Sequence, residues 1–175
     1  MDLIETLAWS LRVVREQTLL EVDGLQPEQF FQQEPPGEHH PAWLLGHLLL
    51  ADSYLLHLLG AEGLPPDFPD VIAAHGPASV PKQDPSRYLP SATLVERLTQ
   101  TGTQRCEIVR GMTPAELQRA TPDPTLAQTQ PTIGHHLHSL VFHEGHHGGQ
   151  LAAWRRRHRL GAARWVFAVD RKTDN

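Results

Sequence analysis

The residues with the clearest potential for chemistry are histidines in the last third of the chain. The sequence of 175 residues contains 12 histidines, several times the usual share, and they are crowded between His135 and His147. His143 and His147 are four positions apart, so on a helix both rings project from one face and can bind a single ion. About one such pair is expected by chance among so many histidines, so the spacing needs support from the elements that carry it.

The helix that must position this pair is predicted from about Thr132 to Leu160, with Gly161 as its C-cap. Two imidazoles that face a core need hydrogen-bond partners or a shared metal, because burying unpaired polar groups costs free energy. His136 lies on the same stripe and is a reserve ligand or a residue that supports the ligands. At about 100° per residue, the stripe that faces the core contains Ile133, His136, Leu140, His143, His147, Leu151 and Trp154.

A third inward-facing histidine is His47, on a helix predicted over residues 41–59 that begins at Pro41. Three neutral imidazoles leave one or more coordination positions open for water or substrate, as expected of a reactive metal site rather than a closed structural one. Imidazole suits Zn²⁺, Ni²⁺, Cu²⁺ or Fe²⁺, and the sequence does not choose among them. The inner stripe of this helix contains Leu44, His47, Ala51, Tyr54 and Leu58.

Two further amphipathic helices complete the predicted fold. One covers residues 2–22, with Asp2 as a possible N-cap, and the other covers residues 91–111, with Ser91 as a possible cap and an apolar inner side. Thr113 to Glu116 form a capping box for one extra short turn. Four amphipathic helices without a convincing strand predict an all-α four-helix bundle, with residues 1–175 forming a single domain. The inner side of the third helix is predicted to carry Leu94, Leu98, Ile108 and Met112.

The connection between the second and third helices is long and rich in proline. The proline rings fix the φ angle and remove backbone N–H donors, which argues against a regular helix. They also make the segment stiffer than a Gly/Ser linker, so we expect an ordered crossover. About thirty residues are far more than antiparallel neighbours need, so these two helices can run parallel. The prolines are Pro65, Pro66, Pro69, Pro77, Pro81, Pro85 and Pro90.

Composition argues against several classes of partner. The formal net charge is -5, from 15 Lys plus Arg against 20 Asp plus Glu, so no positive field is available to hold a nucleic acid. The N-terminus carries acids where a signal peptide carries Lys or Arg, and no apolar run approaches the length of a membrane span. The single cysteine, Cys106, fits a reducing compartment, so a cytoplasmic location is expected.

Three segments carry a family resemblance. His143-Glu144-Gly145-His146-His147-Gly148-Gly149-Gln150-Leu151 resembles the helix-4 signature of the DinB/YfiT-like proteins, in which two histidines four apart precede Gly-Gln-Leu. Pro41-Ala42-Trp43-Leu44-Leu45-Gly46-His47-Leu48 resembles the helix-2 motif of that family, and Thr132-Ile133-Gly134 resembles the opening of helix 4. The resemblance covers essentially the whole chain. It implies a bundle with helices running up-down-down-up, commonly a homodimer, with Zn²⁺ or Ni²⁺ bound by His47, His143 and His147.

The same resemblance implies a class of reactions. Characterised members include thiol S-transferases that use bacillithiol, mycothiol or glutathione, and others are described as metal-dependent hydrolases. The leading hypothesis is that the metal binds a low-molecular-weight thiol as thiolate, lowers its pKa and presents it to an electrophile. Glu144, Gln150 and Tyr54 are candidates for orienting the ligands or handling protons.

Three other functions come into question, of which the sequence disfavours the first, a zinc protease. His143-Glu144-x-x-His147 matches the H-E-x-x-H pattern of zinc proteases, with Glu144 as general base. Against a protease, Ala153 stands where the extended motif has its third ligand, and no Glu follows Glu144. The nearby downstream acids are Asp170 and Asp174. A small-molecule hydrolase at the three-histidine site, and a non-enzymatic binding module stabilised by metal, remain alternatives.

Other reactive or aromatic side chains are assigned structural roles or none. Cys106 is expected to be a small core residue, because nothing nearby in sequence lowers its pKa. The arginines from Arg155 to Arg159 are expected to be solvated and to match the negative end of the helix dipole. The segment from Trp165 to Val169 has the residues of an extended strand, but one such segment makes no sheet. The tryptophans Trp9, Trp43 and Trp154 are expected in the core. The remaining histidines of the last helix, His135, His138 and His146, are expected to face a groove or solvent. No role is assigned to His39, His40, His57, His75 and His158.

Overall fold

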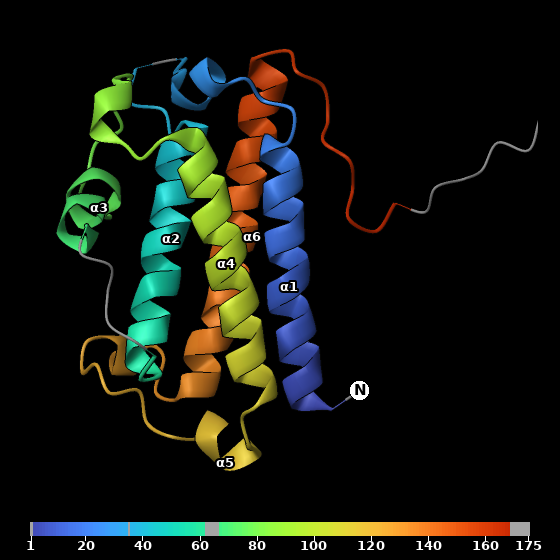
Figure 1. Ribbon diagram of the computed structural model, residues 1–175. Coiled ribbons are helices and arrows are strands. Elements are labelled where there is room, and N and C mark those ends of the chain that lie inside the picture. Colours follow the sequence, from blue (N-terminus) through green and yellow to red (C-terminus); the bar gives the residue numbers. More distant parts are fainter. Residues whose placement is uncertain (1, 35, 62–66, 169–175) are drawn as a thin grey trace, which may run out of the picture.

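The computed structural model describes residues 2–34, 36–61 and 67–168 (Figure 1). All regular structure in these ranges is helical, and the only β pairing there is an isolated bridge between Ala120 and Thr132. The predicted all-α fold is therefore confirmed for the described part of the chain. Among the described residues, no helix has the length and apolar character that crossing a membrane requires.

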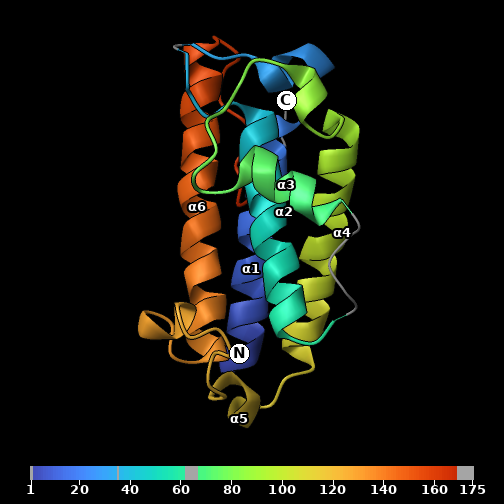
Figure 2. The same ribbon diagram turned by 90° about the vertical axis from the view of Figure 1, so that its left-hand side faces the viewer.

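Four long helices of the described chain lie side by side and form the body of the molecule (Figures 1 and 2). They are α1 (Leu3–Val22), α2 (Pro41–Leu58), α4 (Ser91–Arg110) and α6 (Ile133–Arg157). In Figure 1, α1 and α6 begin at the lower end, whereas α2 and α4 begin at the upper end. Because α2 and α4 run in the same direction, the segment between them has to return along the length of the bundle.

The helix starts follow local capping chemistry. The side chain of Asp2 accepts a hydrogen bond from the N–H of Glu5 at 2.9 Å, so the predicted cap of α1 is confirmed. The capping box at Thr113 is also confirmed and opens the short helix α5 (Pro114–Leu117). Ser91 was expected to cap α4, but it is the first helical residue and Pro90 occupies the cap position without a side-chain hydrogen bond.

The end of α6 differs from the prediction. The helix stops at Arg157 instead of Leu160, and its C-cap is His158 rather than the predicted Gly161. Arg159 is left-handed with φ 57°, and Gly161 is left-handed as well, with φ 71°. The N–H of Leu160 reaches the carbonyl of Arg155 at 3.1 Å and the N–H of Arg159 reaches that of Arg156 at 3.2 Å, the pattern of a Schellman motif. Arg155 is not simply solvated, because it donates to the carbonyl of Glu21 at the end of α1 (2.8 Å).

The crossover contains regular structure that its prolines had argued against. Helix α3 (Phe68–His75) accommodates Pro69 in its first turn, where a missing N–H costs nothing. It buries Phe68, Val71 and His75 and packs on α2 (Figure 2). Pro65 and Pro66 lie outside the described residues. Short 3₁₀ turns also form in connecting segments. Of these, η2 (Pro85–Arg87) lies in the crossover, whereas η1 (Pro27–Phe31) precedes α2 and η3 (Leu126–Gln128) precedes α6.

Several side chains expected in the core are found there and others are not. Trp43 and Trp154 are buried, and Cys106 is a buried core residue whose thiol pKa is raised by burial. Trp9 is 39% exposed and contacts Phe167, so its predicted core position is wrong. On α4, Leu94 and Leu98 are buried as predicted. Near the end of the helix Val109 is buried instead of Ile108, which is only half-buried, as is Met112 just after the helix. Residues 165–168 form a turn rather than an extended strand, and Val169 lies outside the described residues.

A ring of four buried charges occupies the centre of the bundle, with one residue from each long helix. Arg15 of α1 bonds Asp52 of α2 (2.9 Å) and Glu144 of α6 (2.5 Å). Arg105 of α4 bonds the same two carboxylates, each at 2.6 Å. All four side chains are at most 5% exposed. Burial alone would raise the pKa of Asp52, but the charges of Arg105 and Arg15 lower it more, so the carboxylate stays ionised.

The charged ring joins two apolar clusters. One gathers around Leu44, Leu48 and Leu98, and the other around Leu11, Leu55 and Leu137. Arg15 also donates to the carbonyl of Leu98 (2.5 Å), and Arg105 donates to that of Leu11 (2.8 Å), so the ring is tied to both clusters. A buried charge without its partner is costly, and the helices can therefore neither rotate nor slide without breaking an ion pair.

Removing one member of this ring should destabilise the fold. In Arg105→Met, Asp52 and Glu144 would share one cation, and we expect a loss of about 3–5 kcal/mol in the free energy of unfolding. Urea denaturation measures this loss. The control is Glu16→Gln, which removes the exposed Arg12–Glu16 pair on α1 and should cost less than about 1 kcal/mol. Equal losses in both variants would contradict the central role of the ring.

Candidate metal centre

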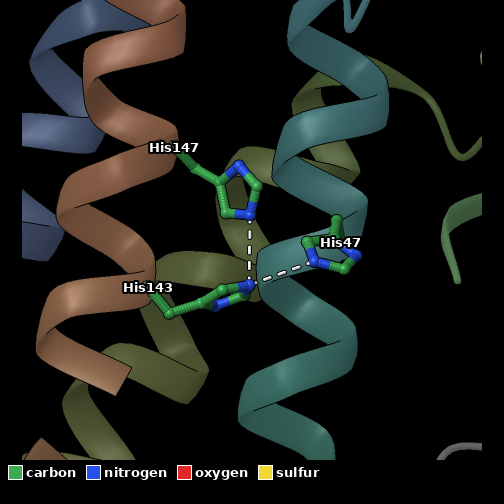
Figure 3. Close-up of side chains that lie close together, drawn as sticks. All are labelled: His47, His143 and His147. Carbon is green, nitrogen blue, oxygen red and sulfur yellow. Dashed lines mark hydrogen bonds between the residues drawn. The ribbon is translucent and has the colours of Figure 1, made fainter. Parts of the chain in front are cut away.

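The three predicted ligand histidines meet between α2 and α6 (Figure 3). Nε2 of His143 lies 3.1 Å from Nε2 of His47 and 3.0 Å from Nε2 of His147. One potential ligand atom from each residue fits within 4.8 Å of the others. The structure thus brings together, from two helices, the residues that the sequence placed on two inward stripes.

The outer nitrogen atoms of two rings fix the protonation pattern of the site. Nδ1 of His47 is 2.8 Å from the carbonyl oxygen of His75, and because a carbonyl only accepts, this Nδ1 carries the proton. Nδ1 of His147 likewise donates to Oε1 of Gln150 (2.8 Å). Nε2 of His47 and of His147 are then both unprotonated, with their lone pairs turned toward Nε2 of His143.

This arrangement fits a metal ion better than a hydrogen-bond network. Nε2 of His143 can donate one proton at most, so at least one of its two neighbours is left without a donor. A cation among the three nitrogens would satisfy all of the lone pairs at once, and neutral imidazoles are the ligands of divalent transition metals. The donor set therefore fits such an ion.

Burial keeps the three rings neutral. It lowers the pKa of His143 and of His147 to about 4, and it also lowers the pKa of His47, although the hydrogen bond to the His75 carbonyl opposes that shift. Because ligand histidines must be deprotonated, proton competition for the site is weak at neutral pH.

Helix α3 holds His47 in place through a residue that sequence analysis left without a role. His75 is 1% exposed, and its Nδ1 donates to the carbonyl of Trp43 (3.1 Å). Its own backbone carbonyl accepts the hydrogen bond from Nδ1 of His47. Its ring packs directly against Gly46, where an added Cβ would lie 1.9 Å from the ring. The available signal was Gly46 itself, a glycine inside a helix immediately before an inward-facing histidine.

Trp43 forms an aromatic wall beside the site. Its ring stacks on His47 with centroids 5.0 Å apart and on His39 with centroids 4.2 Å apart. Its Nε1 donates to Oγ of Ser79 in the crossover (2.8 Å). His39, for which no role was predicted, therefore lies beside the site. The crossover supports His47 through two contacts, the His75 carbonyl on its Nδ1 and the Ser79 hydroxyl that holds the Trp43 ring against it.

The predicted supporting residues have different surroundings. Gln150 lies where it was expected, with Oε1 on His147 and Nε2 3.3 Å from Nε2 of His146. Tyr54 donates to the carboxylate of Asp123, and this bond is the main reason that its pKa rises to about 12. Tyr54 therefore stays protonated and does not bond a ligand histidine.

Glu144 and His136 do not join the three histidines. Glu144 lies about 100° around the helix from His143 and is 1% exposed; its carboxylate accepts hydrogen bonds from Arg15 and Arg105. The expectation that Glu144 bonds a ligand histidine or handles protons at the site is wrong, because both of its carboxylate oxygens are bound by arginines, and the same contacts contradict its use as the base of an H-E-x-x-H protease. His136, the reserve ligand, bonds the side chain of Gln130 and lies outside the group of three.

Comparison with known proteins decides the family. The family model of the DinB superfamily matches residues 10–151. The chain belongs to the DinB superfamily. The match includes His47, His143 and His147, and it confirms the resemblance read from the motifs around them. No curated protein matches the chain.

The contact between Gly46 and His75 can be tested with a pair of glycine variants. Gly46→Ala should force α3 away from α2, costing about 1–3 kcal/mol in stability and, through the lost support of His47, weakening zinc binding on the order of tenfold. The control is Gly149→Ala in α6, where an added Cβ meets nothing within 4 Å. That variant should be neutral or stabilising by about 0.5–1 kcal/mol. Calorimetry measures the stability of each variant, and zinc titration measures its affinity for the metal. A Gly46→Ala variant with unchanged stability and zinc affinity would contradict the close packing of α3 on α2.

The lowered pKa values predict acid sensitivity of the metal-free fold. His40, His75, His143 and His147 each have a pKa near 4, whereas an unfolded histidine titrates near 6.5. On acidification the unfolded chain takes up protons first, so this contribution to stability is complete above pH 6.5 and declines as the pH falls towards 4.

Unfolding free energies measured in urea at several pH values, after chelation of metal, check this expectation. His75→Gln should flatten the decline. The same change at the exposed His57, on α2, should leave the decline as it is in the unmodified protein. A free energy of unfolding that is constant from pH 6.5 to 4.5 would show that the buried histidines are not held neutral.

Proposed function

We propose that this DinB superfamily protein is a metal-dependent enzyme in which His47, His143 and His147 hold a divalent transition metal, zinc or nickel. The observation that carries the proposal is the convergence of three Nε2 atoms at 3.0 and 3.1 Å, with the Nδ1 atoms of His47 and His147 engaged on the outer side. We further propose that the four long helices form the family's up-down-down-up bundle, which the helix directions in Figure 1 support.

The site leaves room for a substrate. Three protein ligands leave coordination positions open on a transition metal. His143 is only half-buried, and a cavity of about 380 Å³ opens beside it, lined in part by Tyr54, His136 and His146. This volume lies within the range of small-molecule sites. A substrate in this cavity would contact His143, the member of the three-histidine group that lines it.

The reaction that we propose is S-transfer from a low-molecular-weight thiol to an electrophile. A bound divalent metal lowers the pKa of a thiol and so supplies the thiolate at neutral pH. The thiol proton passes to solvent, the sulfur forms a bond to an electrophilic carbon, and the leaving group departs with the electron pair of its bond. The chain's own contribution is to keep three neutral rings in place, through the His75 carbonyl and Gln150, and to exclude water on the Trp43 side.

The position of Glu144 favours S-transfer over hydrolysis. A metal-dependent hydrolase uses a base near the metal-bound water, and the acid that the sequence offered for this role is bound by Arg15 and Arg105. A thiol supplies its own nucleophile and requires no such carboxylate. Small-molecule hydrolysis and a non-enzymatic metal-stabilised module remain as alternative outcomes of the experiment.

Metal analysis followed by a thiol panel tests the proposal. Purified protein should bind one equivalent of zinc or nickel, and His47→Ala should lose it, whereas the control His57→Ala on the exposed side of α2 should keep it. Bacillithiol, mycothiol or glutathione should raise the melting temperature of the metal-loaded protein only. One of them should also form a thioether with 1-chloro-2,4-dinitrobenzene in a metal-dependent manner.

The contrary outcomes are distinct. Metal binding that survives His47→Ala would remove the three-histidine site. Ester hydrolysis without any thiol effect would favour the hydrolase, and a metal that affects only stability would favour the non-enzymatic module.

A further inference from the structure

The cavity beside His143 is formed by α2, α6 and the segment around η3. Its walls are mainly apolar, from Ala51, Leu126, Leu140 and Phe142. Its polar side chains are Tyr54, Gln130, His136, Ser139, His143 and His146. No lysine or arginine lines it, so nothing in the wall offers a permanent positive charge to a carboxylate or phosphate.

A carboxylate is bonded to one wall of this cavity: Asp123 does not itself line the cavity, but it is hydrogen-bonded to Tyr54 and Leu126, which do. The carboxylate of Asp123 accepts hydrogen bonds from the hydroxyl of Tyr54 and from the backbone N–H groups of Thr125 (2.8 Å) and Leu126 (2.9 Å). These hydrogen bonds, that of Tyr54 first, lower the pKa of Asp123, so its carboxylate is ionised. Because the Tyr54 hydroxyl is committed to Asp123, its oxygen faces other groups as an acceptor only.

His136 adds a buried polar atom without a partner. The residue is 5% exposed, its Nδ1 bonds Oε1 of Gln130, and its Nε2 has no hydrogen-bond partner among the described residues. With the proton on Nδ1, Nε2 is an acceptor. An unpaired buried acceptor costs free energy. Nε2 is closed to solvent, but His136 lines the cavity, so a donor in the cavity would reach Nε2 after a small shift of the surrounding side chains.

We propose that this cavity is a subsite for a positively charged N–H donor, an ammonium group on a short apolar chain, carried by the substrate that reacts at the three histidines. The Asp123–Tyr54 pair and the unpaired Nε2 of His136 supply charge and acceptors, and the apolar wall receives the chain. The subsite rests on the proposed function, since it names the part of the substrate that lies beside the metal centre. It disfavours substrates with a carboxylate at that position.

Three small thiols that share a sulfur atom and differ in tail charge test the subsite. Cysteamine, 2-mercaptoethanol and 3-mercaptopropionate are titrated calorimetrically into the zinc-loaded protein at low ionic strength. The ratio of cysteamine to mercaptopropionate affinity is then compared between variants, which cancels the intrinsic difference in thiol acidity. In Asp123→Asn this ratio should fall on the order of fivefold, the worth of one close charge pair near water.

The control is Asp84→Asn, which removes an exposed carboxylate of the crossover that bonds Ser86 and not a residue of the cavity wall. It should leave the ratio unchanged. The subsite would be overturned if Asp123→Asn left the ratio unchanged, whichever of the two thiols the unmodified protein prefers.

A second measurement separates the subsite from the thiol chemistry. Propylammonium and propionate carry no sulfur and are added to the protein while the ring signals of His136 are followed by NMR. Propylammonium should shift them and propionate should not. If no thiol binds but propylammonium shifts His136, the thiol function fails and the subsite stands. If thiols bind with an unchanged ratio in Asp123→Asn and propylammonium has no effect, the subsite fails and the thiol function stands.

Discussion

The four-charge ring at the centre of the bundle is the interaction on which the rest of the structure depends. Each long helix contributes one member, and each carboxylate is shared by both guanidinium groups. In a low-dielectric interior the ring is tolerable only while every pair is intact, because a single unpaired charge costs several kcal/mol, on the order of 3–5. An apolar core of leucines alone would allow small rotations and slides of the helices. The ring fixes the rotation of each helix about its own axis and its position along the bundle.

This constraint reaches the metal centre through two of its members. Asp52 follows His47 on α2 by five residues, and Glu144 is the immediate neighbour of His143 on α6. When Asp52 and Glu144 point at the arginines, His47 and His143 are turned toward the seam between α2 and α6, where the Nε2 atoms meet and the cavity opens. The side chain that resembles a catalytic base in the H-E-x-x-H string is therefore the one that fixes the helix carrying the ligands.

A second constraint comes from outside the four long helices. Helix α3 supplies the carbonyl that sets the tautomer of His47, and it can approach α2 closely because residue 46 is a glycine. Gln150, one turn after His147, sets the tautomer of that ring. The outer partners leave the inner nitrogen atoms of both rings unprotonated, so groups outside the three-histidine cluster determine which lone pairs face its centre.

The sequence by itself determined the local features: the amphipathic stripes of the helices, the Asp2 and Thr113 caps, and the i, i+4 pair of His143 and His147. The helix-2 and helix-4 motifs, with the opening of helix 4, indicated the family, and the inner stripe of its helix had already selected His47. Periodicity could not decide which polar residues pair across the core, since Arg15, Asp52 and Arg105 lie 37 or more residues apart and each is unremarkable in its own segment. For that reason Glu144 was assigned to the wrong partner and His75 to none. Only the tertiary structure decided these contacts, because burial makes unpaired charges and unpaired donors costly, and pairing them is a property of the packed helices rather than of any one of them.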